Sequence, residues 1–350
     1  MTRDELEARI RRGEPIRKES LAGIDLVGAK LAGAIFERVD LRGARLGGAD
    51  LSEGIFDDCD LSGALLAAAR LNHTVWTKCT FEDVGAEAAQ AAFATFAECR
   101  FSRVAMARSD LRHASFAQSP LERVDLGSCD LTKVSFADCG EIGADFAGAT
   151  MRETAFVQGD VRGSSFRAID AHKLVFVKCA LGPQDFSGQR LPFAQFLECD
   201  LAGARFDDAR LETCGFRASN LAGASFARAV APTCLFAEAT LVRAVLHETR
   251  LTRSIFLRAS LDEADFAGAK LDQCVFHEAS ANGARFVAAD LTYADFSGAR
   301  IAAADFTAAT LFRTKLHRVD DRGAVFDASR ATALGDDPDL LEAETWRPSI

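Results

Sequence analysis

The chain has 350 residues, of which 49% are hydrophobic, and a formal net charge of −10 at pH 7. This composition is typical of a folded protein, and the acidic balance argues against non-specific binding of nucleic acid. No apolar run approaches the roughly 18 residues that span a bilayer, and the charged N-terminus lacks the apolar core of a secretory signal. We therefore expect a cytoplasmic protein that does not associate with membranes.

The first segment, residues 1–19, predicts a short helix. Thr2 is a candidate N-cap residue, and Glu5 completes a capping box with it. Leu6 and Ile10 lie on one face of this helix, and Gly13-Glu14-Pro15 ends it. We interpret it as a cap on the repeats that follow, because the open end of a stack would pair with other chains.

From Leu21 to Phe326 every fifth residue is large and apolar with few exceptions, and the register never slips. We call these residues central. A small residue, most often Ala, lies two positions before each of them, and all ten cysteines occupy this slot. A period of five fits neither an amphipathic helix nor a strand. The cysteines are therefore interpreted as small buried apolar residues, with a redox role for a stack of Cys59, Cys79 and Cys99 as the alternative.

A second period, of 20 residues, indicates four sides per coil. An unbroken column of aromatic residues runs from Phe36 through Trp76 to Phe296 in steps of 20. The motif Ala-Asp-Leu, as in Ala49-Asp50-Leu51, recurs within this frame. In these features residues 20–330 resemble the pentapeptide-repeat proteins. The resemblance implies an all-β solenoid, a right-handed quadrilateral parallel β-helix of about 15 coils, with the central and small residues inside.

Some places depart from the pattern, among them residues 180–192, where Gly182-Pro183 and Leu191-Pro192 predict altered turns. Residues 82–95 are rich in Ala and predict a weak or bulged coil. Glu141 and Asp321 put a carboxylate at a central position, where burial without a partner is costly. We interpret each as a bulge or a frayed coil, and a functional site is the alternative.

The last segment, residues 331–350, predicts a C-terminal cap. It contains an acidic helix, Asp336–Trp346, whose Leu340, Leu341 and Trp346 are expected to cover the last coil. The alternative is that this segment forms a homodimer, as the resemblance to some family members implies.

No motif points to an enzyme. The stretch from Gly23 to Lys30 lacks the Gly-Lys-Ser/Thr ending of a phosphate-binding loop, and no metal-ligand spacing is present. All six histidines occupy outward positions and are interpreted as solvated surface. We expect no catalytic residue, no cofactor and no metal.

With a filled interior, function must lie on the surface. Outward apolar residues beside the aromatic column predict an interaction strip, or only a preference for strand; the candidates are Ile35, Ile55, Val75, Val157, Val177, Leu197 and Leu257. A second column, two residues after the central position, predicts a docking site for an acidic partner, or a plain solvated face; it comprises His73, Phe93, His113, Lys133, Lys173, Phe193, Arg253, Tyr293 and Arg313.

These surfaces favour a protein–protein interaction scaffold built on a rigid rod, with an unidentified protein partner and no direct binding of nucleic acid. The N-terminal segment resembles that of pentapeptide proteins associated with type VI secretion. The alternative is a DNA mimic, similar to family members that bind DNA gyrase and protect it from quinolones. Mimicry requires a continuous acidic track, whereas the charges here are mixed on every face.

Overall fold

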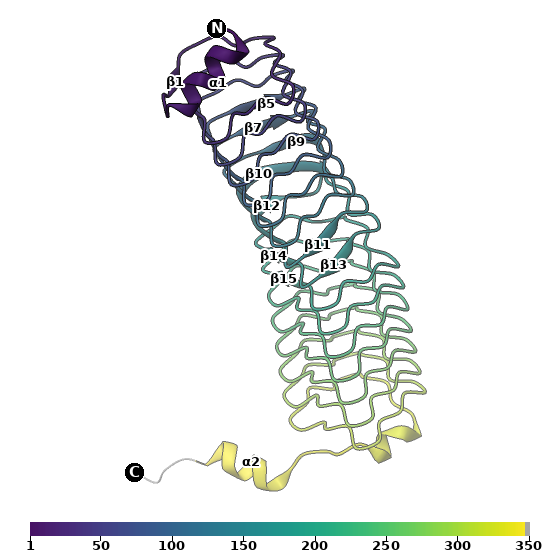
Figure 1. Cartoon of the computed structure of the whole chain (residues 1–350). Helices are drawn as coiled ribbons and strands as arrows, with labels where there is room; N and C mark the ends of the chain where they lie inside the picture. The colour runs from purple at the N-terminus through teal and green to yellow at the C-terminus, as the bar shows by residue number, and fades with distance from the viewer. Residues whose placement is uncertain (347–350) are drawn as a thin grey trace. The chain divides into compact units, whose positions relative to one another are not determined.

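A computed structural model describes residues 1–346 and divides them into two compact units, Met1–Ala180 and a second that begins at Leu181. Residues 347–350 of the expected C-terminal cap lie outside the described residues. Both units consist of coils joined by short parallel strands (Figure 1). Within residues 1–346, neither helix has the length and hydropathy that crossing a membrane requires.

The first unit begins with helix α1 (Arg3–Arg11) and then contains short strands. These are β1 (Ile16–Arg17), β2 (Ile35–Glu37), β3 (Ile55–Asp57), β4 (Val75–Thr77), β5 (Thr80–Glu82), β6 (Thr95–Ala97), β7 (Arg100–Ser102), β8 (Ser115–Ala117), β9 (Leu121–Asp125), β10 (Ser135–Asp145), β11 (Thr150–Arg152), β12 (Ala155–Asp160), β13 (Asp170–His172) and β14 (Val175–Val177). The second unit contains β15 (Gln195–Leu197), the 3₁₀ helix η1 (Ala328–Thr332) and helix α2 (Pro338–Thr345).

The strands and bridges pair in parallel at a spacing of 20 residues. Phe36 faces Phe56 across β2 and β3, and single bridges continue the same spacing in the second unit. The predicted fold class, a parallel β-solenoid with 20-residue coils, is therefore confirmed. We expected about 15 coils in one continuous solenoid. The number of coils in one compact unit is lower, because the chain divides into two units after Ala180.

The central residues form the core, as predicted. Phe rings of one column stack on one another, with centroids 4.8 Å apart for Phe136 and Phe156 and 5.0 Å for Phe216 and Phe236. Rings of adjacent columns meet edge to face, which is the other favoured aromatic geometry. Trp76 fits the same column because its indole N–H has an acceptor, the Thr74 hydroxyl, at 2.8 Å.

The small inward position is tied to the coil before it. The Cys129 thiol donates to the Met106 carbonyl at 3.0 Å, and the Ser109 hydroxyl in the same slot donates to the Ala86 carbonyl at 3.0 Å. All ten cysteines are buried. Burial raises the pKa of Cys129 to about 12 and that of Cys139 to about 11, so these groups remain thiols at neutral pH. The geometry agrees with the interpretation of cysteine as a packing residue.

A true bulge occurs at Glu141. The register between β10 and β12 shifts after Ala137, which places Glu141 at the surface and Ile142 in the core, where it is 1% exposed. The bulge that we predicted from a carboxylate at a central position is confirmed. The prediction of a weak or bulged coil at residues 82–95 is wrong. This stretch forms a regular coil, and its central Ala86 and Ala91 are buried.

Helix α1 covers the first coil largely by apolar contact. Leu6 is fully buried and Ile10 is 8% exposed. The capping box is present: the Thr2 hydroxyl accepts from the Glu5 N–H, and the Glu5 carboxylate accepts from the Thr2 N–H. Both features agree with the sequence prediction.

Polar side chains of α1 also pair with the open edge of the first coil. The Arg3 guanidinium donates to the carbonyls of Val27 at 3.0 Å and Gly28 at 3.2 Å. The Glu7 carboxylate accepts from the Lys30 N–H at 3.1 Å. The helix thus supplies partners to backbone groups that no preceding coil can reach.

The last coil is closed in a different way. Backbone carbonyls of Thr332 and Leu334 accept from the N–H groups of Arg313 at 2.9 Å and Leu316 at 2.8 Å. Two aspartates accept from further N–H groups of this coil: Asp327 from Ala308 and Asp336 from Arg318, each at 2.7 Å. Hydrogen bonds from residues 327–336 therefore cover this edge.

The prediction that apolar side chains of residues 336–346 cover the last coil is wrong. Leu340 is 44% exposed and Trp346 is 71% exposed, and Leu341 is only half-buried. These side chains do not bury against the coil because the preceding residues already satisfy its edge. Asp321, at the central position before Phe326, is partly exposed and pairs with Arg330 at 3.4 Å.

Candidate functional site

In the first unit, one part of the predicted basic and aromatic column forms a continuous ladder. The rings of His73 and Phe93 stack with centroids 4.9 Å apart, and those of Phe93 and His113 stack at 4.5 Å. All three side chains are exposed, and Phe93 is 48% exposed. Lys133 continues the column, with Glu153 between it and Lys173. We call His73, Phe93 and His113 the aromatic ladder.

The ladder stands on strained backbone. Each of its residues lies at the corner two positions after a central residue, with φ of 60°, 61° and 60° for His73, Phe93 and His113. A bulky residue with such a left-handed φ is uncommon, since its Cβ crowds the backbone. The corner nevertheless directs each ring outward, so rings one coil apart stack on one another.

The predicted apolar strip is not continuous. Parallel pairing brings Ile35, Ile55 and Val75 together on β2, β3 and β4, and Ile55 and Val75 are exposed. Val157 and Val177 face one another on β12 and β14 and are half-buried. In the second unit, Leu197 and Leu257 are half-buried and lie three coils apart. Binding of a partner by the first group stays a prediction.

In the second unit the basic and aromatic column forms an aromatic cluster at Tyr293. The Tyr293 ring meets the Phe312 ring edge to face at 5.7 Å, and the Arg313 guanidinium lies 5.9 Å from the Tyr293 ring centre. Phe193 is 43% exposed and lies five coils away from Tyr293 in the sequence frame. Arg253 donates to the Gln273 side chain at 3.1 Å.

Surface charges are largely paired across coils. Arg17 contacts Glu37 at 2.8 Å and Arg228 contacts Asp208 at 2.7 Å, in each case one coil apart. The guanidinium of Arg228 lowers the pKa of Asp208, which keeps that carboxylate ionised. Four further pairs join adjacent coils, namely Arg45–Asp25, Arg70–Asp50, Arg258–Glu278 and Arg285–Asp265. Two lie within one coil, namely Arg42–Asp40 and Arg112–Asp110.

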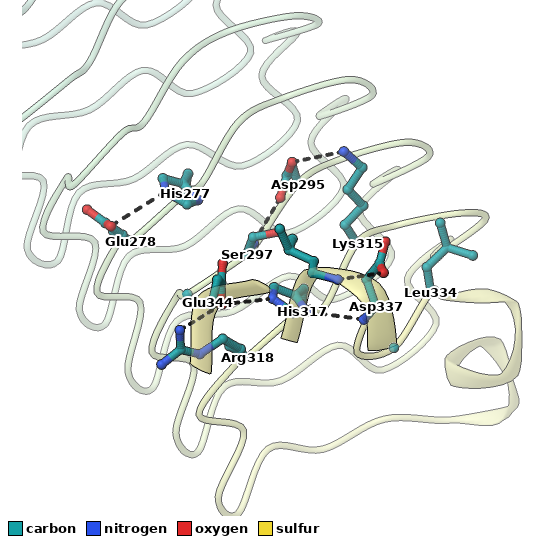
Figure 2. Close-up of a pocket in the computed structure, with 13 residues that line it drawn as sticks. His277, Glu278, Asp295, Ser297, Lys315, His317, Arg318, Leu334, Asp337 and Glu344 are labelled. Carbon is teal, nitrogen blue, oxygen red and sulfur yellow. Dashed lines mark hydrogen bonds and ion pairs between the residues drawn. The ribbon is translucent and has the colours of Figure 1, made fainter. Parts of the chain in front are cut away.

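The second unit also contains a cavity of about 600 Å³ beside α2, which the sequence did not reveal. Figure 2 shows side chains of the coils and of residues 334–344 converging on it. Two ion pairs line the cavity: Lys315 with Asp295 at 3.4 Å and Arg318 with Glu344 at 2.7 Å. The His277 ring lies 3.5 Å from the Glu278 carboxylate.

His317 lies at the centre of this contact. Although it occupies an outward position, it is only 5% exposed, so its expected place on the solvated surface is wrong. Its Nδ1 accepts from the Asp337 N–H at 3.1 Å, and its Nε2 lies 3.4 Å from the Glu344 carboxylate. With Nδ1 as an acceptor, the neutral ring carries its proton on Nε2 and donates it to Glu344.

Glu344 is held by two groups from the coil. The Arg318 guanidinium, and to a smaller extent His317, lower the pKa of this carboxyl. The ion pair is well exposed, and such pairs contribute little to stability. The sequence missed this site because no local pattern shows that residues 336–344 fold back onto residues 317–318.

Comparison with protein families accounts for the repeat. A model described as "Pentapeptide repeats (8 copies)" matches residues 20–58, 185–217 and 216–258, and one described as "Pentapeptide repeat region" matches residues 249–326. The chain belongs to the pentapeptide-repeat family. A search of curated proteins gave no match to this pentapeptide-repeat protein.

Two of the solved structures similar to this chain are described as pentapeptide-repeat proteins. HetL of Nostoc sp. strain PCC 7120, involved in regulating heterocyst differentiation, is 20% identical over 90% of this chain and 96% of its own, with a TM-score of 0.21. Rfr23 of Cyanothece 51142 is 20% identical over 36% of this chain and 91% of its own, with a TM-score of 0.28.

QnrB1, a plasmid-mediated fluoroquinolone resistance protein, is 16% identical over 71% of this chain and 97% of its own, with a TM-score of 0.22. At these identities and scores the alignments carry no functional information. The models and structures named here do not support the resemblance to proteins associated with type VI secretion, which remains a prediction.

Proposed function

We propose that this pentapeptide-repeat protein is a non-enzymatic scaffold that binds a protein partner through the aromatic ladder of its first unit. One observation carries the proposal: three aromatic side chains stack in the solvent at coil spacing on a backbone that parallel pairing holds in place. Exposed aromatic rings are enriched in protein interfaces, where they bury a large area at a small cost in side-chain entropy.

The charge pattern favours this proposal over mimicry of DNA. A DNA mimic presents unpaired carboxylates in a row, whereas arginines neutralise many carboxylates of both units. The alternative, binding to DNA gyrase, is tested by a supercoiling assay with the purified protein. Inhibition of supercoiling would contradict a scaffold as the only role.

The scaffold proposal is tested by capturing partners on the immobilised full-length chain. Phe93→Ser removes the middle ring of the aromatic ladder and leaves the core unchanged, so we expect a specific partner to be lost. Leu65→Ser is the matched control, because Leu65 is 52% exposed and lies on a different side of the coil. Equal loss with both variants, or retention with both, would contradict the proposed role of the aromatic ladder.

A further inference from the structure

The segment that covers the cavity of the second unit is strongly acidic. Residues 336–346 contain five carboxylates and no lysine or arginine, namely Asp336, Asp337, Asp339, Glu342 and Glu344. Closure of the last coil uses residues up to Asp336, which leaves α2 without a role in covering that edge. What α2 covers instead is a patch on the side of the coils that includes His317 and Arg318.

The coil side of this contact is a preformed cradle for one carboxylate. Arg318 donates from its guanidinium to Glu344 at 2.7 Å, and His317 offers its Nε2 to the same oxygen at 3.4 Å. The Asp337 N–H fixes the His317 ring from the other side. Figure 2 shows both coil residues directed toward Glu344. Lys315, which also lines the cavity, adds a further cation close by.

The hold on α2 is polar and easily exchanged. Trp346 is 71% exposed, and Leu340, which borders the cavity, is 44% exposed, so lifting α2 exposes little further apolar surface of these two side chains. It opens the cavity of about 600 Å³ and uncovers His317. A carboxylate from elsewhere can form the same two contacts as Glu344.

We propose that His317 and Arg318 form a docking site for an acidic segment of a protein partner, and that α2 occupies this site in cis as a displaceable competitor. This deepens the scaffold proposal by naming the chemistry of one partner, on a unit other than the one with the aromatic ladder. The chain's own acidic segment occupies this site and indicates what the partner resembles. We expect the partner to present a glutamate to Arg318 from a short helix or turn. Attraction between an acidic segment and the Arg318 guanidinium weakens as salt screens it.

The test uses the full-length chain and a fluorescent peptide of residues 336–346 as the probe, followed by anisotropy. Glu344→Gln in the chain weakens the cis contact, so we expect the peptide to bind about two- to five-fold more tightly than to the unaltered chain, because the site is then open for a larger fraction of time. Asp339→Asn is the matched control, because it removes one charge of the same segment from a residue that does not line the cavity. This variant is expected to bind like the unaltered chain.

Two further measurements decide the chemistry. Adding Arg318→Ala to the Glu344→Gln chain should abolish peptide binding, and a peptide that itself carries Glu344→Gln should bind weakly to every chain. Binding that is indifferent to Arg318, or an equal gain from Asp339→Asn, would overturn the proposal. Neither result bears on Phe93, so failure here leaves the role of the aromatic ladder standing, and loss of that role leaves this site untouched.

Discussion

The two ends of the chain close their coils by different means. At the N-terminus, α1 buries Leu6 and Ile10 and adds polar contacts to the edge. At the C-terminus, carbonyls and aspartates of residues 327–336 accept hydrogen bonds from the edge, and Leu340 of α2 stays 44% exposed. Because its apolar side chains are buried, the N-terminal helix stabilises the folded state. Closure by hydrogen bonds leaves the C-terminal helix available for binding.

The largest expected effect is at the N-terminal end. Leu6→Ala removes a fully buried side chain, and such changes lower the free energy of unfolding by about 2–5 kcal/mol. Urea unfolding followed by circular dichroism measures the change. Amide exchange at Lys30, whose N–H bonds to Glu7, shows whether the edge opens as α1 detaches. An unfolding midpoint equal to that of the unaltered chain would contradict the claim that apolar burial of α1 stabilises the N-terminal end.

A smaller effect is expected from Asp327, which accepts from the Ala308 N–H at the closing edge. Asp327→Ala leaves this N–H without its acceptor, so its exchange should become about five-fold faster or more. Asp327→Asn keeps an acceptor oxygen and should restore most of the protection. Hydrogen exchange of Ala308 in the three proteins measures both effects. Equal exchange in all three would show that water replaces the carboxylate without cost.

We expect the two ends of the chain to differ in their sensitivity to acid. The Ser329 N–H lowers the pKa of Asp327, and the Arg318 guanidinium lowers that of Glu344. A carboxyl whose pKa is lower in the folded state stabilises that state fully above its unfolded pKa, and this contribution is lost as the pH falls through the folded value.

We therefore expect residues 327–346 to loosen below about pH 4, near the ordinary carboxyl pKa. Glu5 and Glu7 of α1 also have lowered pKa values, from hydrogen bonds to Thr2 and to the Lys30 N–H, but Leu6 and Ile10 hold this helix without charge. Hydrogen exchange across a pH series, corrected for the intrinsic rate, should show protection lost at the C-terminal end first. Simultaneous loss at both ends would refute the distinction.

The smallest effect is expected from Leu340→Ala in α2. Because Leu340 is 44% exposed, the free energy of unfolding should change by no more than about 0.5 kcal/mol. Urea unfolding beside Leu6→Ala gives a direct contrast between the same substitution at the two ends. A destabilisation comparable to that of Leu6→Ala would mean that α2 packs on the coil after all.

The sequence was sufficient for the coils because one rule applies to every repeat. A central residue such as Phe136 stacks on Phe156, 20 residues later, so the period alone gives the contact. The charged central residue Glu141 correctly indicated a bulge, since a carboxylate without a partner is costly to bury. That Ile142 takes its place in the core depends on how β10 realigns, which no repeat pattern encodes.

The candidate site at α2 could not be predicted, because it depends on a single contact between segments that share no period. His317 has the same outward position as any other surface histidine, but Asp337 and Glu344 contact it and it is only 5% exposed. The aromatic ladder was partly predictable: the column was recognised, but the stacking of His73, Phe93 and His113 required the left-handed corner that aligns the rings.

The left-handed corners have a consequence for how such a protein can evolve. Residues as different as Phe93, Lys133 and Glu153 adopt nearly the same φ there, of 61°, 60° and 56°. The fold accepts almost any side chain at a corner for a modest and similar strain, and glycine for none. New recognition chemistry can therefore be acquired one corner at a time, without any change in the residues that hold the coils together.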